Sequence, residues 1–112
     1  MTPKQAFKAM PKQIVVGAYI YSLKPVQIAG GDAGNLAHVD TEAQTIEIKS
    51  SLASPAAIIG CALHEVMHII WGASGLAKRA DEESAILAFD AGLTLLFQKN
   101  PTFLVWIQKC LK

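Results

Sequence analysis

The first half of the chain has the short-period pattern of β-strands. The run Ile14–Val26 is rich in β-branched and aromatic residues, which predicts a strand, with Pro25 ending it or marking it as an edge strand. Residues 45–49 alternate isoleucine with charged side chains, as a strand with one buried face does. With residues 36–40 before it, this segment predicts a hairpin, and the glycine-rich stretch 27–35 predicts a loop.

The second half carries helical signals. Ser54 precedes a proline, so its hydroxyl can cap a helix whose first position the proline fills; glycines after Trp71 predict the helix end. A connection over 73–80 leads to a second helix, 82–98, with an aspartate at its N-cap position. An Asn-Pro pair separates that helix from a short apolar segment, 103–107, which we expect to pack onto the domain rather than serve a partner.

The order of these elements predicts an α+β fold. The 112 residues fit one domain with one hydrophobic core, and no internal repeat divides them. Residues 1–13 contain two prolines and predict a loosely ordered lead-in with at most one helical turn. The strands are expected to form a small antiparallel sheet packed on the helix that follows Ser54.

Composition narrows the classes of function. Ten Lys+Arg against nine Asp+Glu give a net charge of +1, which argues against nucleic acid or an anionic membrane as the main partner. No secretory signal is visible, and no apolar run is expected to approach the length of a membrane span. Two cysteines give no disulfide framework, so we expect a cytoplasmic protein.

The candidate chemistry lies in the helix after Ser54, where residues 64–68 read H-E-x-x-H. Helix positions four apart differ by about 40° around the axis and roughly 6 Å along it, so His64 and His68 can share a metal ion. Glu65 lies about 100° round, beside the same face. Zinc would polarise a substrate carbonyl and lower the pKa of water to about 7, while Glu65 takes the water's proton. This is the arrangement that a zinc-dependent peptidase needs.

The remaining positions around the motif are apolar, so the helix is expected to be buried on its other sides. These positions are Ile58, Ile59, Leu63, Val66, Met67, Ile69 and Ile70. A buried polar strip needs partners, and a metal ion would provide them. The alternative is a pair of core histidines that are hydrogen-bonded within the protein.

A catalytic zinc ion needs a third protein ligand, with water in the fourth place. The variety H-E-x-x-H-x-x-G-x-x-H is excluded by Trp71 and Ser74. His38 lies upstream, on the predicted hairpin, and fits a surface or substrate-side residue better than a ligand. Cys61 precedes His64 by one turn, but three ligands on successive turns of one helix close poorly around a tetrahedral ion, so we expect a buried, inert thiol.

An acidic residue at the start of the second helix is the remaining candidate for the third ligand. Glu82 and Glu83 both stand there, although the helix dipole favours acids in any first turn. Periodicity places Glu82 on the inward face, in line with Ile86, Phe89 and Leu93. Glu83 lies at the margin of that face, so the pattern alone leaves both residues as candidates.

Several features together resemble the small phage and bacterial zincin-like metallopeptidases of the ImmA/IrrE type. They are the H-E-x-x-H motif, the hairpin before it, a following helix that begins Glu82-Glu83-Ser84-Ala85-Ile86, and the Asn100-Pro101 pair. The resemblance covers roughly residues 34–101 and implies a minimal zincin-like α+β domain. It also implies a peptide or protein substrate that pairs in extended form with an edge strand within residues 36–49.

In that family the third zinc ligand is a glutamate that opens the helix after the metal motif. Glu83 matches the family's Glu-Ala-Asn-x-Phe-Ala pattern better than Glu82 does, with two positions of the pattern unmatched. The resemblance therefore implies His64, His68 and Glu83 as the ligands of Zn²⁺, and Glu65 as the general base.

Two classes of function follow. The first is a zinc metallopeptidase in which Glu65 is base and then proton donor to the leaving amine; a hydrolase of non-peptide amides is a variant of it. The second is a non-catalytic regulator that keeps the motif helix as a structural element, which would leave Glu65 without a use. Tyr19 and Tyr21 are the unassigned candidates for an oxyanion donor, and the apolar C-terminal helix allows a homodimer.

Overall fold

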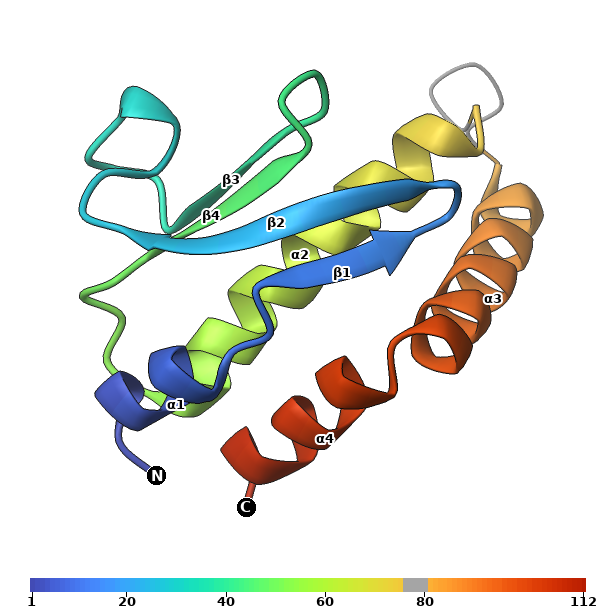
Figure 1. The fold of residues 1–112 in the computed structure, drawn as a ribbon. Helices are drawn as coiled ribbons and strands as arrows, with labels where there is room; N and C mark the ends of the chain where they lie inside the picture. The colour runs from blue at the N-terminus through green and yellow to red at the C-terminus, as the bar shows by residue number, and fades with distance from the viewer. Residues whose placement is uncertain (76–80) are drawn as a thin grey trace.

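The computed structural model describes residues 1–75 and 81–112, which form a sheet layer and a helix layer (Figure 1). The described elements are α1 (Pro3–Ala9), β1 (Gln13–Val16), β2 (Tyr19–Val26), η1 (Ala29–Gly31), β3 (Ala37–Asp40), β4 (Thr45–Lys49), α2 (Pro55–Ala73), α3 (Glu82–Lys99) and α4 (Pro101–Cys110). The predicted α+β fold class is confirmed. Of the predicted connection 73–80, only residues 73–75 lie among those described.

The four-stranded sheet has the order β1-β2-β4-β3. β3 pairs with β4 in antiparallel fashion, as predicted for the hairpin. β1 and β2 are also antiparallel, but β2 and β4 are parallel. The prediction of an antiparallel sheet is therefore wrong, because β4 inserts between β2 and β3. Within the segment 36–49, only β3 lies at an edge of the sheet.

The predicted single strand over 14–26 is also wrong, because the chain reverses within it. Gly17 adopts a left-handed conformation with φ of 61°, which glycine tolerates, and Val16 pairs with Tyr19 across a two-residue turn. The inward residues change from even to odd numbers across the turn, from Ile14 and Val16 to Tyr21 and Leu23.

Residues 1–13, predicted as a loosely ordered lead-in, instead contain α1. Thr2 and Gln5 form a reciprocal capping box at its start. Ala6 is fully buried, and its carbonyl accepts a hydrogen bond of 2.9 Å from Trp106 Nε1 on α4. This contact explains why both chain ends lie on the same side of the molecule (Figure 1).

Helix α2 is the centre of the core. It begins as predicted, with the Ser54 hydroxyl accepting from the Ala57 amide, and its Ile58 and Val66 are fully buried together with Ile46 and Ile48 of β4. Among the described residues it is also the one helix long and apolar enough to cross a membrane, contrary to the sequence prediction. Such length and composition are equally those of a helix packed on a sheet, as α2 is here.

Helices α3 and α4 complete the helix layer. Gly92 of α3 lies so close to Ile70 of α2 that an added Cβ atom would come within 2.9 Å of the Ile70 side chain. At the corner between α3 and α4, Asn100 is buried and bonds to both backbone groups of Val15. The apolar segment 103–107 packs inward through Phe103, confirming the expectation that it joins the core.

Candidate metal centre

His64 and His68 lie one turn apart on the face of α2 that is open to solvent. Their Nε2 atoms are 3.2 Å apart, and their rings meet edge to face with centroids 4.8 Å apart. The apolar positions around the motif were predicted to be buried. This is wrong for Met67, which lies beside the histidines and is 39% exposed. The histidines are thus accessible to a ligand from solvent.

The imidazole pair fits a zinc ion geometrically. Two nitrogens at the Zn–N distance of about 2.0–2.1 Å and a tetrahedral angle of about 109° would be about 3.3 Å apart. The observed Nε2–Nε2 distance of 3.2 Å is close to this value. The same distance also allows one neutral ring to donate a hydrogen bond to the other, so it is compatible with a metal-free pair.

Glu65, between the exposed His64 and His68 in the sequence, is only 7% exposed. Its side chain reaches a cavity of about 520 Å³, which it lines together with His64. The opposite wall of this cavity comes from residues 34–37, at the start of β3. Glu65 and His64 therefore border a common space beside an edge strand.

In the part of the chain that the structure describes, a third ligand does not join the histidine pair. Among residues 1–75 and 81–112, no three His, Cys, Asp or Glu side chains are close enough to hold one metal ion. Glu82 and Glu83 lie in the first turn of α3 and are exposed, while Asp81 caps that helix by accepting from the Ser84 amide. The choice of Glu82 or Glu83 as ligand stays a prediction.

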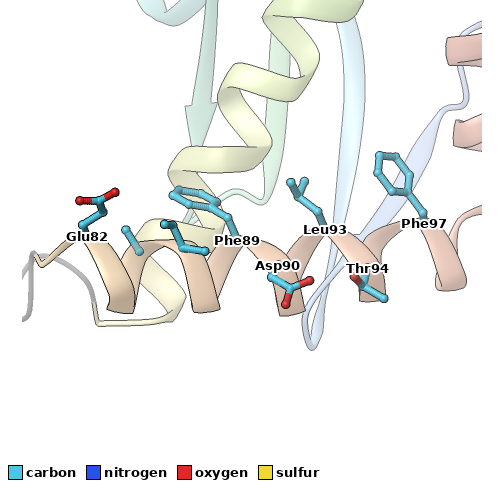
Figure 2. A pocket seen from close by; sticks show the side chains of 8 residues that line it. Glu82, Phe89, Asp90, Leu93, Thr94 and Phe97 are labelled. Carbon is cyan, nitrogen blue, oxygen red and sulfur yellow. The ribbon is translucent and has the colours of Figure 1, made fainter.

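The face of α3 that was predicted to turn inward is only partly buried. Phe89 and Leu93 are half-buried, but Glu82 is exposed and Ile86 is 54% exposed, so the prediction is wrong for these two residues. Glu82, Phe89 and Leu93 lie along a hollow of about 640 Å³, and their side chains point to the same side of the helix (Figure 2). Asp90 and Thr94 point away from that side (Figure 2). Among the described residues, those that line this hollow belong to α3, and they include neither histidine of the motif.

A second cavity, of about 400 Å³, lies on the other side of the motif, where His68 meets Tyr19 and Tyr21 of β2. Burial raises the pKa of the Tyr21 phenol, and the neighbouring Tyr19 raises it further. Tyr21 is therefore a protonated hydrogen-bond donor at neutral pH. Both tyrosines were candidate donors from the sequence, but their positions were not predicted. They are two residues apart on β2, which puts both side chains on one face of the sheet, and this spacing could have placed them together.

Among the described residues, neither His38 nor Cys61 forms a three-ligand group with the pair. His38 is on β3 between Ala37 and Val39, which pack on the core, so its ring faces the other side of the sheet, where it approaches Gly30. Cys61 is half-buried on the wall of the Glu65 cavity. Burial, followed by the charge of Glu65, raises the pKa of the Cys61 thiol, which agrees with the expected inert thiol.

Comparison of the chain with protein-family models, curated proteins and solved structures found no match.

Proposed function

We propose that this chain is a zinc-dependent metallopeptidase with a minimal zincin-like fold. His64 and His68 hold Zn²⁺ together with Glu83 of α3, and Glu82 is the alternative third ligand. The observation that carries the proposal is the pair of exposed histidines whose Nε2 atoms are 3.2 Å apart, with the adjoining Glu65 lining a cavity together with His64. A purely structural pair of histidines would not need that carboxylate.

The chain's own residues supply the proton transfers. Zinc, when bound, would polarise the substrate carbonyl and make water more acidic. Glu65 takes a proton from the water whose oxygen attacks the carbonyl carbon, and then gives that proton to the leaving nitrogen. The C–N bond breaks, which leaves a carboxylic acid and an amine. Tyr19 or Tyr21, beside His68, is the donor for the developing oxyanion.

The substrate is an extended peptide that pairs with β3. The outer side of β3 is an edge of the sheet, and its backbone groups there are available for strand addition. The cavity beside Glu65 includes Ala37 from the start of this strand, and the cavity beside His68 includes Thr41, just after its end. A peptide along β3 would therefore pass the histidine pair between the two cavities.

A non-catalytic regulatory module is the second candidate. It is favoured by one observation, that no third ligand joins the histidines within the part of the chain that the structure describes. Such a module would bind its partner through the same strand edge but would not hydrolyse it.

Metal content and peptide hydrolysis of the purified protein separate the two candidates. We expect one equivalent of zinc in the unmodified protein and in Glu65→Gln, but hydrolysis only in the former. Zinc binding with no hydrolysis of a diverse peptide mixture would favour the regulatory module. Absence of zinc binding would contradict the metallopeptidase.

The third ligand is tested by a matched pair of variants, Glu82→Ala and Glu83→Ala. Both positions are exposed in the first turn of α3, so their effects on folding should be alike. We expect weaker zinc binding in Glu83→Ala alone. Loss of zinc affinity in Glu82→Ala alone would assign the site to the alternative residue.

A further inference from the structure

The cavity beside Glu65 is built mainly from small and apolar side chains. Its walls include Leu36 and Leu52 on the strand side and Ala57 and Cys61 on α2. Its volume of about 520 Å³ lies within the range of about 300–1,000 Å³ typical of ligand pockets. This space can accept a branched or aromatic side chain.

The polar groups around the cavity argue against an acidic occupant. Glu65 supplies a carboxylate, which would repel an acidic side chain. The Asn35 amide already donates a hydrogen bond of 3.1 Å to the Ala29 carbonyl, so it is engaged within the protein. The remaining lining therefore favours an uncharged, apolar group.

Gly60 is the lining residue whose identity the fold does not explain. Glycine inside a helix costs about 1 kcal/mol relative to alanine. At Gly92 the close contact with Ile70 accounts for glycine, but a Cβ atom at Gly60 would meet nothing within 4 Å. Gly60 lines the cavity, so a side chain there would occupy part of it.

We propose that this cavity is a specificity pocket that takes one apolar side chain, of the size of leucine or phenylalanine, from the peptide paired with β3. Gly60 sets the depth of the pocket. The inference rests on the proposed function, because it assumes that a peptide passes Glu65.

The first test compares cleavage preferences in a library of capped peptides varied on both sides of the cleaved bond. The zinc-loaded unmodified protein should prefer leucine or phenylalanine at one position. Gly60→Leu should cut kcat/KM for those peptides by about 10-fold or more while keeping cleavage of glycine or alanine peptides. Gly60→Ala should have a smaller effect in the same direction. Ala91→Leu adds the same side chain at an exposed position of α3 outside the cavity, and it should leave the preference unchanged.

The second test does not depend on hydrolysis. In zinc-loaded Glu65→Gln, leucine or phenylalanine peptides should slow alkylation of Cys61, which lines the cavity, and leave Cys110 on α4 unaffected. Glycine peptides should protect Cys61 less, and adding Gly60→Leu should abolish the difference. Each alkylation rate is compared with that of the same variant without peptide.

The outcomes distinguish the pocket from the peptidase. Size-dependent protection of Cys61 in Glu65→Gln, together with no hydrolysis by the unmodified protein, would support the pocket and overturn the peptidase. Hydrolysis whose preference is the same in Gly60→Leu would overturn the pocket and leave the peptidase standing. A preference for lysine or arginine at this position would also overturn the pocket, because Glu65 rather than the apolar wall would then govern recognition. The pocket would also be overturned if no peptide changed the rate at which Cys61 is alkylated.

Discussion

Asn100→Ala should be among the most destabilising substitutions in the chain. The Asn100 side chain accepts from the Val15 amide at 2.8 Å and donates to the Val15 and Leu96 carbonyls, both at 2.7 Å. It is only 6% exposed, so water has little access to these groups. The amide thus joins the corner of α3 and α4 to the edge strand β1.

The magnitude follows from the groups left without partners. Removing the side chain leaves the part-buried N–H and carbonyl of Val15 and the buried carbonyl of Leu96 without this partner, and each costs about 1–3 kcal/mol when unsatisfied. Allowing for water that enters the space, we expect a loss of about 3–5 kcal/mol. The total stability of a domain is about 5–15 kcal/mol, so a large fraction would be lost. At about 4 °C per kcal/mol, Tm should fall by roughly 12–20 °C.

Urea unfolding followed by circular dichroism measures this loss. Asn35→Ala is the matched control, because the half-buried Asn35 side chain makes a single hydrogen bond of 3.1 Å. That variant should lose about 0.5–1.5 kcal/mol. If Asn100→Ala costs no more than Asn35→Ala, the assignment of Asn100 as the bond between the helix corner and β1 is refuted.

Three further predictions concern helix contact, backbone strain and thiol reactivity. Gly92→Ala should destabilise the protein by about 1–3 kcal/mol in urea unfolding, because its Cβ atom would come within 2.9 Å of a buried isoleucine. Gly30→Ala should lower the thermal stability by at least about 1–2 kcal/mol, since φ is 60° and the Cβ atom would approach the His38 ring to 2.5 Å. In metal-free protein, Glu65→Gln should lower the raised pKa of the Cys61 thiol, which gives more thiolate at a given pH. Alkylation of Cys61, followed by mass spectrometry, should therefore be faster.

The helix-contact and thiol predictions each have a control within the chain. Gly72→Ala adds a Cβ atom that meets nothing within 4 Å, so it should be neutral or slightly stabilising. Equal effects of Gly72→Ala and Gly92→Ala would contradict the helix-contact argument. The pKa of Cys110 is raised chiefly by its own burial, so Glu65→Gln should leave its alkylation unchanged. Faster alkylation of both cysteines would instead indicate general opening of the fold.

Much of the fold could be predicted from the sequence because its signals are local. The caps at Ser54 and Asp81 set the starts of α2 and α3, and alternation identified β4. Local signals failed where distant contacts decide the structure. The parallel pairing of β2 with β4 joins Ser22 to Thr45, and α1 is held by a bond from Trp106.

The same distinction separates the two halves of the candidate site. Helix geometry alone predicted that His64 and His68 would converge, and their 3.2 Å separation agrees with it. The position of a third ligand depends on how α3 is set against α2, which no spacing within either helix determines. Glu65 was expected beside the histidines, but its burial and its cavity depend on the sheet packed against α2.

A crystal structure of the zinc-loaded protein, with anomalous scattering measured at the zinc edge, tests the central claim most directly. The account predicts one anomalous peak about 2.0–2.1 Å from Nε2 of both His64 and His68, with a carboxylate oxygen of Glu83 or Glu82 as the third protein ligand. A zinc peak elsewhere, or one bound by the histidines with no glutamate from α3, would contradict it.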